Sequence, residues 1–152
     1  MNPMANPLRV LFLCTGNSAR SQIAEGLLRS FSRGAVDVHS AGTVPQPAVH
    51  PRAVTTMREK YGLDIGSQFP KTLDRYVGQH WDYVIAVCDR AAESCPIFPG
   101  DPERIHWSFP DPAAVVGTPE QQQRAFDTVA ADIAGRLQLW LSLPAVAKRI
   151  GS

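Results

Sequence analysis

Apolar and polar residues follow two patterns along the chain, and their order predicts an α/β fold. Four stretches have the short apolar or alternating pattern of β-strands: residues 8–13, 36–40, 82–88 and 104–107. Three longer stretches carry apolar residues at helical spacing: residues 21–32, 51–61 and 119–143. Because strands and helices alternate, we expect a four-stranded parallel sheet with helices on both faces and a ligand site at the carboxyl ends of the strands.

Several helix boundaries carry explicit signals. Pro51 and Gly62 are typical of the first residue of a helix and of its end. Residues 118–121, Thr-Pro-Glu-Gln, form a capping box that predicts the start of the last helix. Between these helices, residues 63–71 are expected to be irregular, and residues 72–77 are expected to form a short helix.

Length and composition predict one domain over residues 1–152, since 44% of the residues are hydrophobic and one core can be buried. Residues 1–7 and 145–152 are expected to be loosely held termini. A net charge of +1 and the absence of a basic run argue against nucleic acid as a partner. No apolar stretch reaches membrane-spanning length, and the N-terminus does not resemble a signal peptide, so we expect a cytoplasmic protein without membrane contact.

The segment between the first strand and the first helix predicts an oxyanion site with a nucleophilic thiol. Gly16 and Asn17 tolerate left-handed backbone conformations, which turn successive N–H groups toward one side. The planar fork of Arg20 can bind two oxygens of an anion, and the helix start favours the thiolate of Cys14. Ser21 can donate a hydrogen bond to that sulfur. The predicted oxyanion-binding residues after Cys14 are Thr15, Gly16, Asn17, Ser18, Ala19, Arg20 and Ser21.

A simpler interpretation is that Cys14 is an ordinary buried thiol at the end of a core strand. The joint occurrence of strand, cysteine, five small or polar residues, arginine, serine and helix argues against it. In a cytoplasmic protein, three cysteines are more typical of catalytic or redox-active thiols than of structural disulfides.

Cys88 and Cys95 are seven residues apart, and the residues between them are acceptable helix formers. In a helix their Cα atoms would lie about 10.5 Å apart, whereas a disulfide needs roughly 4.4–6.8 Å. A bond between them would therefore require the helix to unwind or loop out. The alternatives are two small core residues or a zinc site. The spacing does not favour zinc, and the histidines show no ligand grouping: they are His39, His50, His80 and His106.

Three motifs resemble the arsenate reductases built on the low-molecular-weight tyrosine phosphatase fold: CTGNSARSQIAEG, VCDRAAESCP and HWSFPDPA. The resemblance implies a flavodoxin-like three-layer sandwich, arsenate as substrate with phosphate or sulfate as mimics, and thioredoxin or a similar dithiol protein as partner. It also implies a relay in which Cys14 attacks arsenate, Asp111 protonates the departing oxygen, and Cys88 and then Cys95 resolve the adduct as disulfides. Glutathione and mycothiol stay open as alternative reductants.

The same resemblance bears on cofactors. Asn17, Glu25 and Ser40 match positions that help to bind a potassium ion in some members, and the fourth position of that site falls at Lys71. We hypothesise that the Lys71 ammonium replaces the ion, with ordinary surface charge as the alternative. No other cofactor is expected.

Two further functions remain open. A low-molecular-weight tyrosine phosphatase would use Cys14, Arg20 and Asp111 alone. Phosphatases of this fold usually carry an aromatic residue after the Asp-Pro pair, whereas this chain has Ala113. A module that binds oxyanions or senses redox state without catalysis would need neither a nucleophile nor an acid. Asp111 itself has an alternative role, because most Asp-Pro pairs only initiate a turn.

Overall fold

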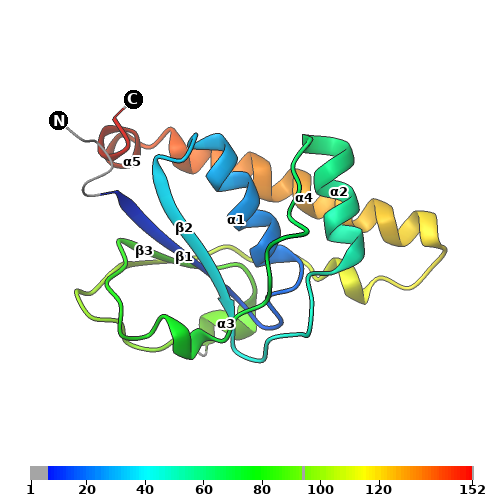
Figure 1. Cartoon of the computed structure of the whole chain (residues 1–152), viewed down its shortest axis with the longest axis horizontal. Coiled ribbons are helices and arrows are strands. Elements are labelled where there is room, and N and C mark those ends of the chain that lie inside the picture. The colour runs from blue at the N-terminus through cyan, green and yellow to red at the C-terminus, as the bar shows by residue number, and fades with distance from the viewer. Residues whose placement is uncertain (1–6, 94, 152) are drawn as a thin grey trace.

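A computed structural model describes residues 7–93 and 95–151. Its centre is a four-stranded, fully parallel sheet in the order β2-β1-β3-β4, as predicted (Figure 1). The strands are β1 (Leu8–Cys14), β2 (Val36–Gly42), β3 (Tyr83–Ala86) and β4 (Glu103–His106). The carboxyl ends of the strands therefore lie along one edge, where β1 delivers Cys14.

In the described part of the chain, five α-helices connect and cover the strands: α1 (Arg20–Phe31), α2 (Pro51–Tyr61), α3 (Asp89–Glu93), α4 (Pro119–Leu141) and α5 (Pro144–Arg149). The predicted boundary signals are confirmed. Pro51 begins α2, Gly62 follows it in the left-handed conformation with a φ of 65°, and both hydrogen bonds of the capping box at Thr118 are present. Within the described residues, no helix combines the length and hydropathy needed to cross a membrane.

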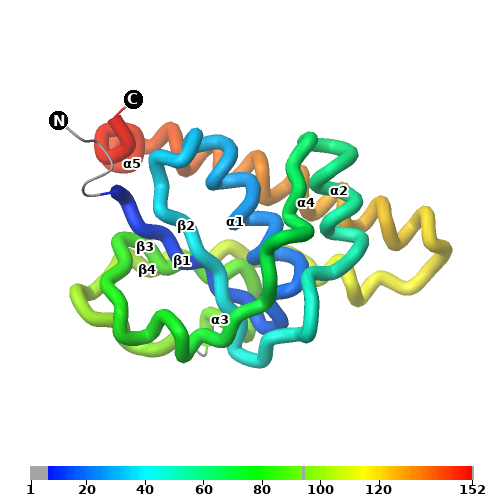
Figure 2. Tube along the Cα trace, in the orientation of Figure 1, coloured from blue at the N-terminus to red at the C-terminus, as the bar shows by residue number. Residues whose placement is uncertain are grey.

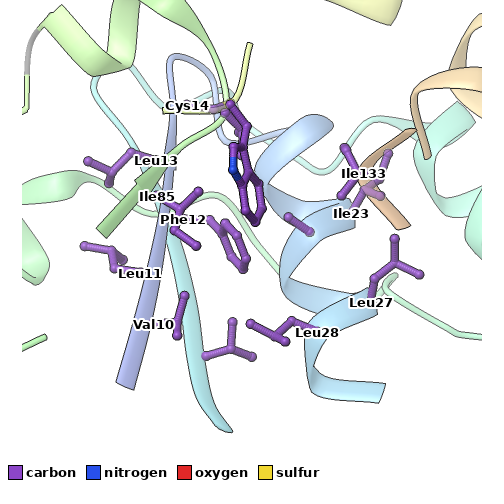
Figure 3. Close-up of a cluster of buried hydrophobic side chains, with 14 of the residues drawn as sticks. Val10, Leu11, Phe12, Leu13, Cys14, Ile23, Leu27, Leu28, Ile85 and Ile133 are labelled. Carbon is purple, nitrogen blue, oxygen red and sulfur yellow. The ribbon is translucent and has the colours of Figure 1, made fainter. Parts of the chain in front are cut away.

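The two faces of the sheet are covered differently. Val10 and Phe12 lie between β1 and α1, whereas Leu11 points to the other face (Figure 3). His39, which is paired with Leu11 in the ladder, packs on the second face with its ring 5.5 Å from Trp81. Residues from the 3-10 helix Leu73–Arg75 and from α3 complete this second layer. The architecture is therefore the predicted three-layer α/β fold.

The connection from α2 to β3 brings residues 63–71 to the edge of the sheet at which the strands end. Figure 2 follows the chain from α2 back past the end of β2 and on to β3. Residues 63–71 are irregular, as predicted, and the expected helix over 72–77 is a single 3-10 turn. The N–H of Gly42 donates to the carbonyl of Lys71 at 2.8 Å, so this segment is tied to the end of β2.

Two predictions need correction. The tail expected over 145–152 is wrong for most of its length, because α5 spans Pro144–Arg149, buries Val146 and places Arg149 3.2 Å from Asp82. The strand expected over 82–88 is shorter, because β3 pairs with β1 and β4 over only four residues. The prediction for the N-terminus lies outside the described residues, except for Pro7.

Candidate active site

The loop between β1 and α1 forms the floor of a cavity of about 580 Å³. Cys14 ends the strand and Arg20 begins the helix, as the sequence predicts. The cavity brings together the predicted nucleophile, arginine and acid, and its lining residues include Cys14, Thr15, Gly16, Ser18, Arg20 and Asp111.

The buried side chain of Asn17 anchors this loop. Its φ is 50°, and its side chain is fully buried. The amide Nδ2 donates to the hydroxyls of Ser21 at 2.7 Å and Ser40 at 2.9 Å, and Oδ1 accepts from the backbone N–H of Lys71 at 2.9 Å. The predicted left-handed residue is therefore also the anchor that fixes the loop.

Gly16 does not use a left-handed conformation, which corrects one part of the prediction. The space around it is tight instead, since a Cβ there would lie 3.0 Å from Cγ of the Gln46 side chain, which would have to shift. Gly42 is more restricted still, because its Cβ would lie 2.6 Å from the carbonyl oxygen of Thr15. The end of β2 thus packs directly against the loop.

Arg20 and Asp111 are linked through the segment that follows β4. One guanidinium nitrogen of Arg20 donates to the carbonyl of Phe109 at 3.0 Å. Oδ1 of Asp111 accepts from the N–H of Ala113 at 3.0 Å and caps a 3-10 turn. The turn-forming role of Asp111 is therefore real, and the same residue also lines the cavity.

Cys88 follows β3 and lies beside Cys14, where the parallel topology predicts it. Its Sγ is 3.5 Å from Oγ1 of Thr15. The hydrogen bond that Cys88 receives from Cys14 lowers the pKa of Cys88 to about 5, against the opposing effect of burial and with further help from Thr15. Thr15 was predicted only as an oxyanion-loop residue, and the sequence gives no signal for this contact.

The same contact raises the pKa of Cys14, and burial raises it further. Hydrogen bonds from Ser21 and from the N–H of Asn17, together with the charge of Arg20, act in the opposite direction. Ser21 and the loop N–H of Asn17 thus act on the sulfur in the predicted direction, but the net shift contradicts the prediction that the thiolate of Cys14 is favoured. Cys14 and Cys88 thus shift each other's pKa in opposite directions, which favours the thiolate of Cys88.

Cys95 lies apart from this pair. It is half-buried and lines a separate cavity of about 150 Å³ with Arg104 and His106. Burial raises the pKa of Cys95, and the charge of Arg104 opposes that effect. All three cysteines are free thiols. The predicted helix between Cys88 and Cys95 is observed as α3, over residues 89–93.

The four residues proposed for a cation site also come together. Oε1 of the buried Glu25 accepts from Ser40 at 2.6 Å, and Oε2 pairs with Arg29 at 2.7 Å. The ammonium of Lys71 lies 3.7 Å from Oε1 of Glu25 and donates to the carbonyl of Phe69 at 2.8 Å. Lys71 is only 9% exposed, so its interpretation as surface charge is wrong. Burial lowers the pKa of Lys71, and Glu25 opposes that shift.

Other residues of the cavity wall were not predicted. Gln46, Pro47 and His50 line it from the segment between β2 and α2. No sequence motif marks these three residues as part of a site, although His50 occupies the capping position before Pro51. Within residues 7–93 and 95–151, no cluster of His, Cys, Asp or Glu has the grouping needed to hold a metal ion.

A strand-ending thiol, a short loop that lines the cavity and an arginine at the helix start are the features of a thiol-based oxyanion site. Residues 9–149 match the protein family described as low molecular weight phosphotyrosine protein phosphatase. An arsenate reductase from Halalkalibacterium halodurans is 42% identical over 129 residues, which cover 85% of this chain and 91% of that protein.

Two solved structures extend the comparison. An arsenate reductase in the oxidized state superposes with a TM-score of 0.73 at 27% identity, covering 93% of this chain and 98% of that one. A thioredoxin-dependent arsenate reductase from Corynebacterium glutamicum superposes with a TM-score of 0.62 at 30% identity, covering 90% of this chain and 65% of that one. The chain therefore belongs to the low-molecular-weight phosphotyrosine protein phosphatase family, and within it resembles proteins named arsenate reductases.

Proposed function

We propose that the protein reduces arsenate to arsenite through a relay of Cys14, Cys88 and Cys95. In the first step the sulfur of Cys14 attacks arsenic while the proton of its thiol passes to the Cys88 thiolate. The Cys14–arsenic bond forms and one arsenic–oxygen bond breaks. Asp111 donates the proton with which that oxygen leaves as water.

In the second step Cys88 attacks the sulfur of Cys14, and its thiol proton passes to the departing arsenite. The sulfur–arsenic bond breaks, and its electron pair goes to arsenic, which is reduced from As(V) to As(III). Cys95 then attacks Cys88, frees Cys14 and leaves a Cys88–Cys95 disulfide. A dithiol protein returns this disulfide to two thiols, so two electrons are used for each arsenate.

The contact of Cys88 with Cys14 is the observation that supports this proposal over a phosphatase. A phosphatase needs only Cys14, Arg20 and Asp111, and it has no use for a second thiol with a pKa of about 5 next to the nucleophile. Thr15, 3.5 Å from Cys88, favours the thiolate of the attacking sulfur in the second step. The intact Cys14 and Asp111 argue against a module that only binds oxyanions.

Thioredoxin or a similar dithiol protein is the reductant that we propose. The thioredoxin-dependent relative from Corynebacterium glutamicum supports this choice. Phosphate and sulfate should occupy the same loop without reacting, because both present tetrahedral oxygens to the same donors.

We further propose that Lys71 takes the place of a potassium ion beside the loop. Its ammonium already lies 3.7 Å from Glu25 and is bonded to the carbonyl of Phe69. A second cation there would be repelled by the ammonium, so these residues do not fit a potassium ion well.

Turnover of arsenate with thioredoxin, thioredoxin reductase and NADPH tests the proposal. Cys88→Ser and Cys95→Ser should both abolish this turnover, because each removes one thiol of the relay. Cys95→Ser should retain the wild-type rate of aryl phosphate hydrolysis, which does not use that thiol, and this rate is the matched control for folding. Cys88→Ser should still hydrolyse aryl phosphate, at a rate that also reflects the changed pKa of Cys14, and its melting temperature is the control for folding. Arsenate turnover by Cys88→Ser at the wild-type rate would reject the relay.

A further inference from the structure

His50 lies in the wall of the active-site cavity, and the proposed reaction gives it no role. The cavity that contains Cys14 and Arg20 is also lined by His50 and Asp111. Asp111 lies close enough for its charge to act on the imidazole. A polar ring thus shares the space in which the departing oxygen must be protonated.

Three contacts fix the position of this residue. Its backbone N–H donates to the carbonyl of Ser18 at 2.8 Å, which ties it to the oxyanion loop. Its Nδ1 accepts from the N–H of Arg52 at 3.1 Å and caps α2. Its ring lies 4.5 Å from the ring of Phe126, centroid to centroid. The backbone, one ring nitrogen and one ring face are therefore all held.

The remaining polar atom of the ring is Nε2. Because Nδ1 accepts a hydrogen bond, the neutral ring carries its proton on Nε2. In the part of the chain that the structure describes, Nε2 has no hydrogen-bond partner. Burial, and then the charge of Arg52, lower the pKa of His50 against the opposing effect of Asp111, which favours the neutral ring. His50 is therefore a fixed, neutral N–H donor at the cavity wall.

We propose that His50 is a substrate-binding residue whose Nε2–H donates to the outward-facing oxygen of bound arsenate, the same oxygen that Asp111 protonates. Cys14 attacks from the loop, so in-line displacement directs the departing oxygen away from the loop, toward the part of the cavity beside Asp111. This assignment rests on the proposed function, and it adds a selectivity for free oxyanions. An aryl phosphate carries its organic group on that oxygen, so the same N–H contributes less to its binding.

Two variants separate substrate binding from a structural role. His50→Asn keeps an acceptor that can cap α2 but loses the ring, whereas His50→Phe keeps a ring against Phe126 but loses both nitrogens. The first measurement is the concentration of inorganic phosphate that protects Cys14 from iodoacetamide. The second is the arsenate concentration for half-maximal single-turnover oxidation. Melting temperatures of both variants monitor the cap.

We expect both variants to need at least about tenfold more phosphate and arsenate, the loss typical of one hydrogen bond to a charged group. The KM for an aryl phosphate should rise less than about threefold. Wild-type phosphate affinity in both variants, or in His50→Asn alone, would overturn the assignment. The phosphate measurement needs no turnover. Wild-type protein that binds phosphate but reduces no arsenate would therefore reject the proposed function and leave the role of His50 testable.

Discussion

The loop after Cys14 and the segment from Cys88 to Cys95 carry the thiols of the proposed relay, but they are built in opposite ways. The loop is anchored by the fully buried Asn17, which bonds to the hydroxyls of Ser21 and Ser40. In the described residues of the second segment, the regular structure is the five-residue helix α3. A hydrogen bond of 2.8 Å between the exposed side chains of Asp89 and His106 links it to β4.

This difference matches the two tasks that we propose. An oxyanion is stabilised best by donors that are already oriented before it binds. Disulfide exchange from Cys88 to Cys95 instead requires the intervening backbone to rearrange. Isolated helices this short are marginal in water, and a solvent-exposed hydrogen bond contributes only about 0.5–1.5 kcal/mol. The segment from Cys88 to Cys95 is therefore suited to movement, and the loop after Cys14 is suited to binding.

The largest effect is expected in the loop. Asn17→Ala removes three hydrogen bonds and places alanine at a φ of 50°, so the free energy of unfolding should fall by about 2–4 kcal/mol. Arsenate reduction and aryl phosphate hydrolysis should both decrease by more than about tenfold. Urea unfolding and the two rate assays measure these effects.

Arg90→Ala, at an exposed position of α3, is the matched control in the segment from Cys88 to Cys95. Its unfolding free energy should stay within about 0.5 kcal/mol of the wild type. Equal destabilisation by the two substitutions would remove the contrast between the regions.

The pH dependence of alkylation tests the coupling between the regions. With Cys95→Ser as background, Cys88 should titrate near pH 5, because Cys14 donates a hydrogen bond to its thiolate. The thiolate should be present above that pH and lost below it. Adding Cys14→Ala removes the donor, and the midpoint should rise toward the usual cysteine value of about 8.5.

Iodoacetamide rates with mass mapping of the Cys88 peptide provide this titration. A midpoint that stays near pH 5 in Cys14→Ala would show that α3 and Thr15 set the pKa without Cys14.

A smaller effect is expected for Ala92→Gly in α3. The lower helix propensity of glycine weakens the helix by about 1 kcal/mol. If the helix must unwind before Cys95 attacks, Cys88–Cys95 disulfide formation should become up to about fivefold faster. Rapid quenching after a single addition of arsenate measures this rate.

Ala131→Gly, at an exposed position of α4, changes helix propensity in the same way and should leave the rate unchanged. An unchanged rate in Ala92→Gly as well would mean that unwinding does not limit the exchange.

The smallest effect concerns cations. If Lys71 replaces a potassium ion, exchanging sodium for potassium should change neither the turnover rate nor the melting temperature. Lys71→Asp should gain stabilisation by potassium, since it restores an acidic group beside Glu25. Potassium activation of the wild-type enzyme would contradict the proposed role of Lys71.

The sequence predicts the anchored region well because its signals are local. The strand, the loop and the helix around Cys14 are contiguous, and their boundaries differ from the prediction by one residue. The sequence also predicts that Cys88 lies at the same edge of the sheet as Cys14, because parallel strands align their carboxyl ends. The capping box at Thr118 also needs only neighbouring residues.

The features that the sequence does not predict depend on contacts between distant segments. Helix α5 forms where Val146 is buried and Arg149 reaches Asp82, and no local pattern predicts that packing. The place of His50 in the cavity depends on how the segment after β2 folds over the loop. The burial of Lys71 likewise follows from its position beside the end of β2.

The central claim is that arsenate drives electrons from Cys88 and Cys95 through Cys14, and one single-turnover measurement tests it directly. Reduced protein is mixed with one equivalent of arsenate without a reductant, quenched by alkylation, and mapped by mass spectrometry. We predict one arsenite per protein, a Cys88–Cys95 disulfide and a free Cys14, with the Cys95→Ser variant stopping at Cys14–Cys88. Arsenite release without any disulfide, or three alkylated cysteines and unreacted arsenate, would contradict the account.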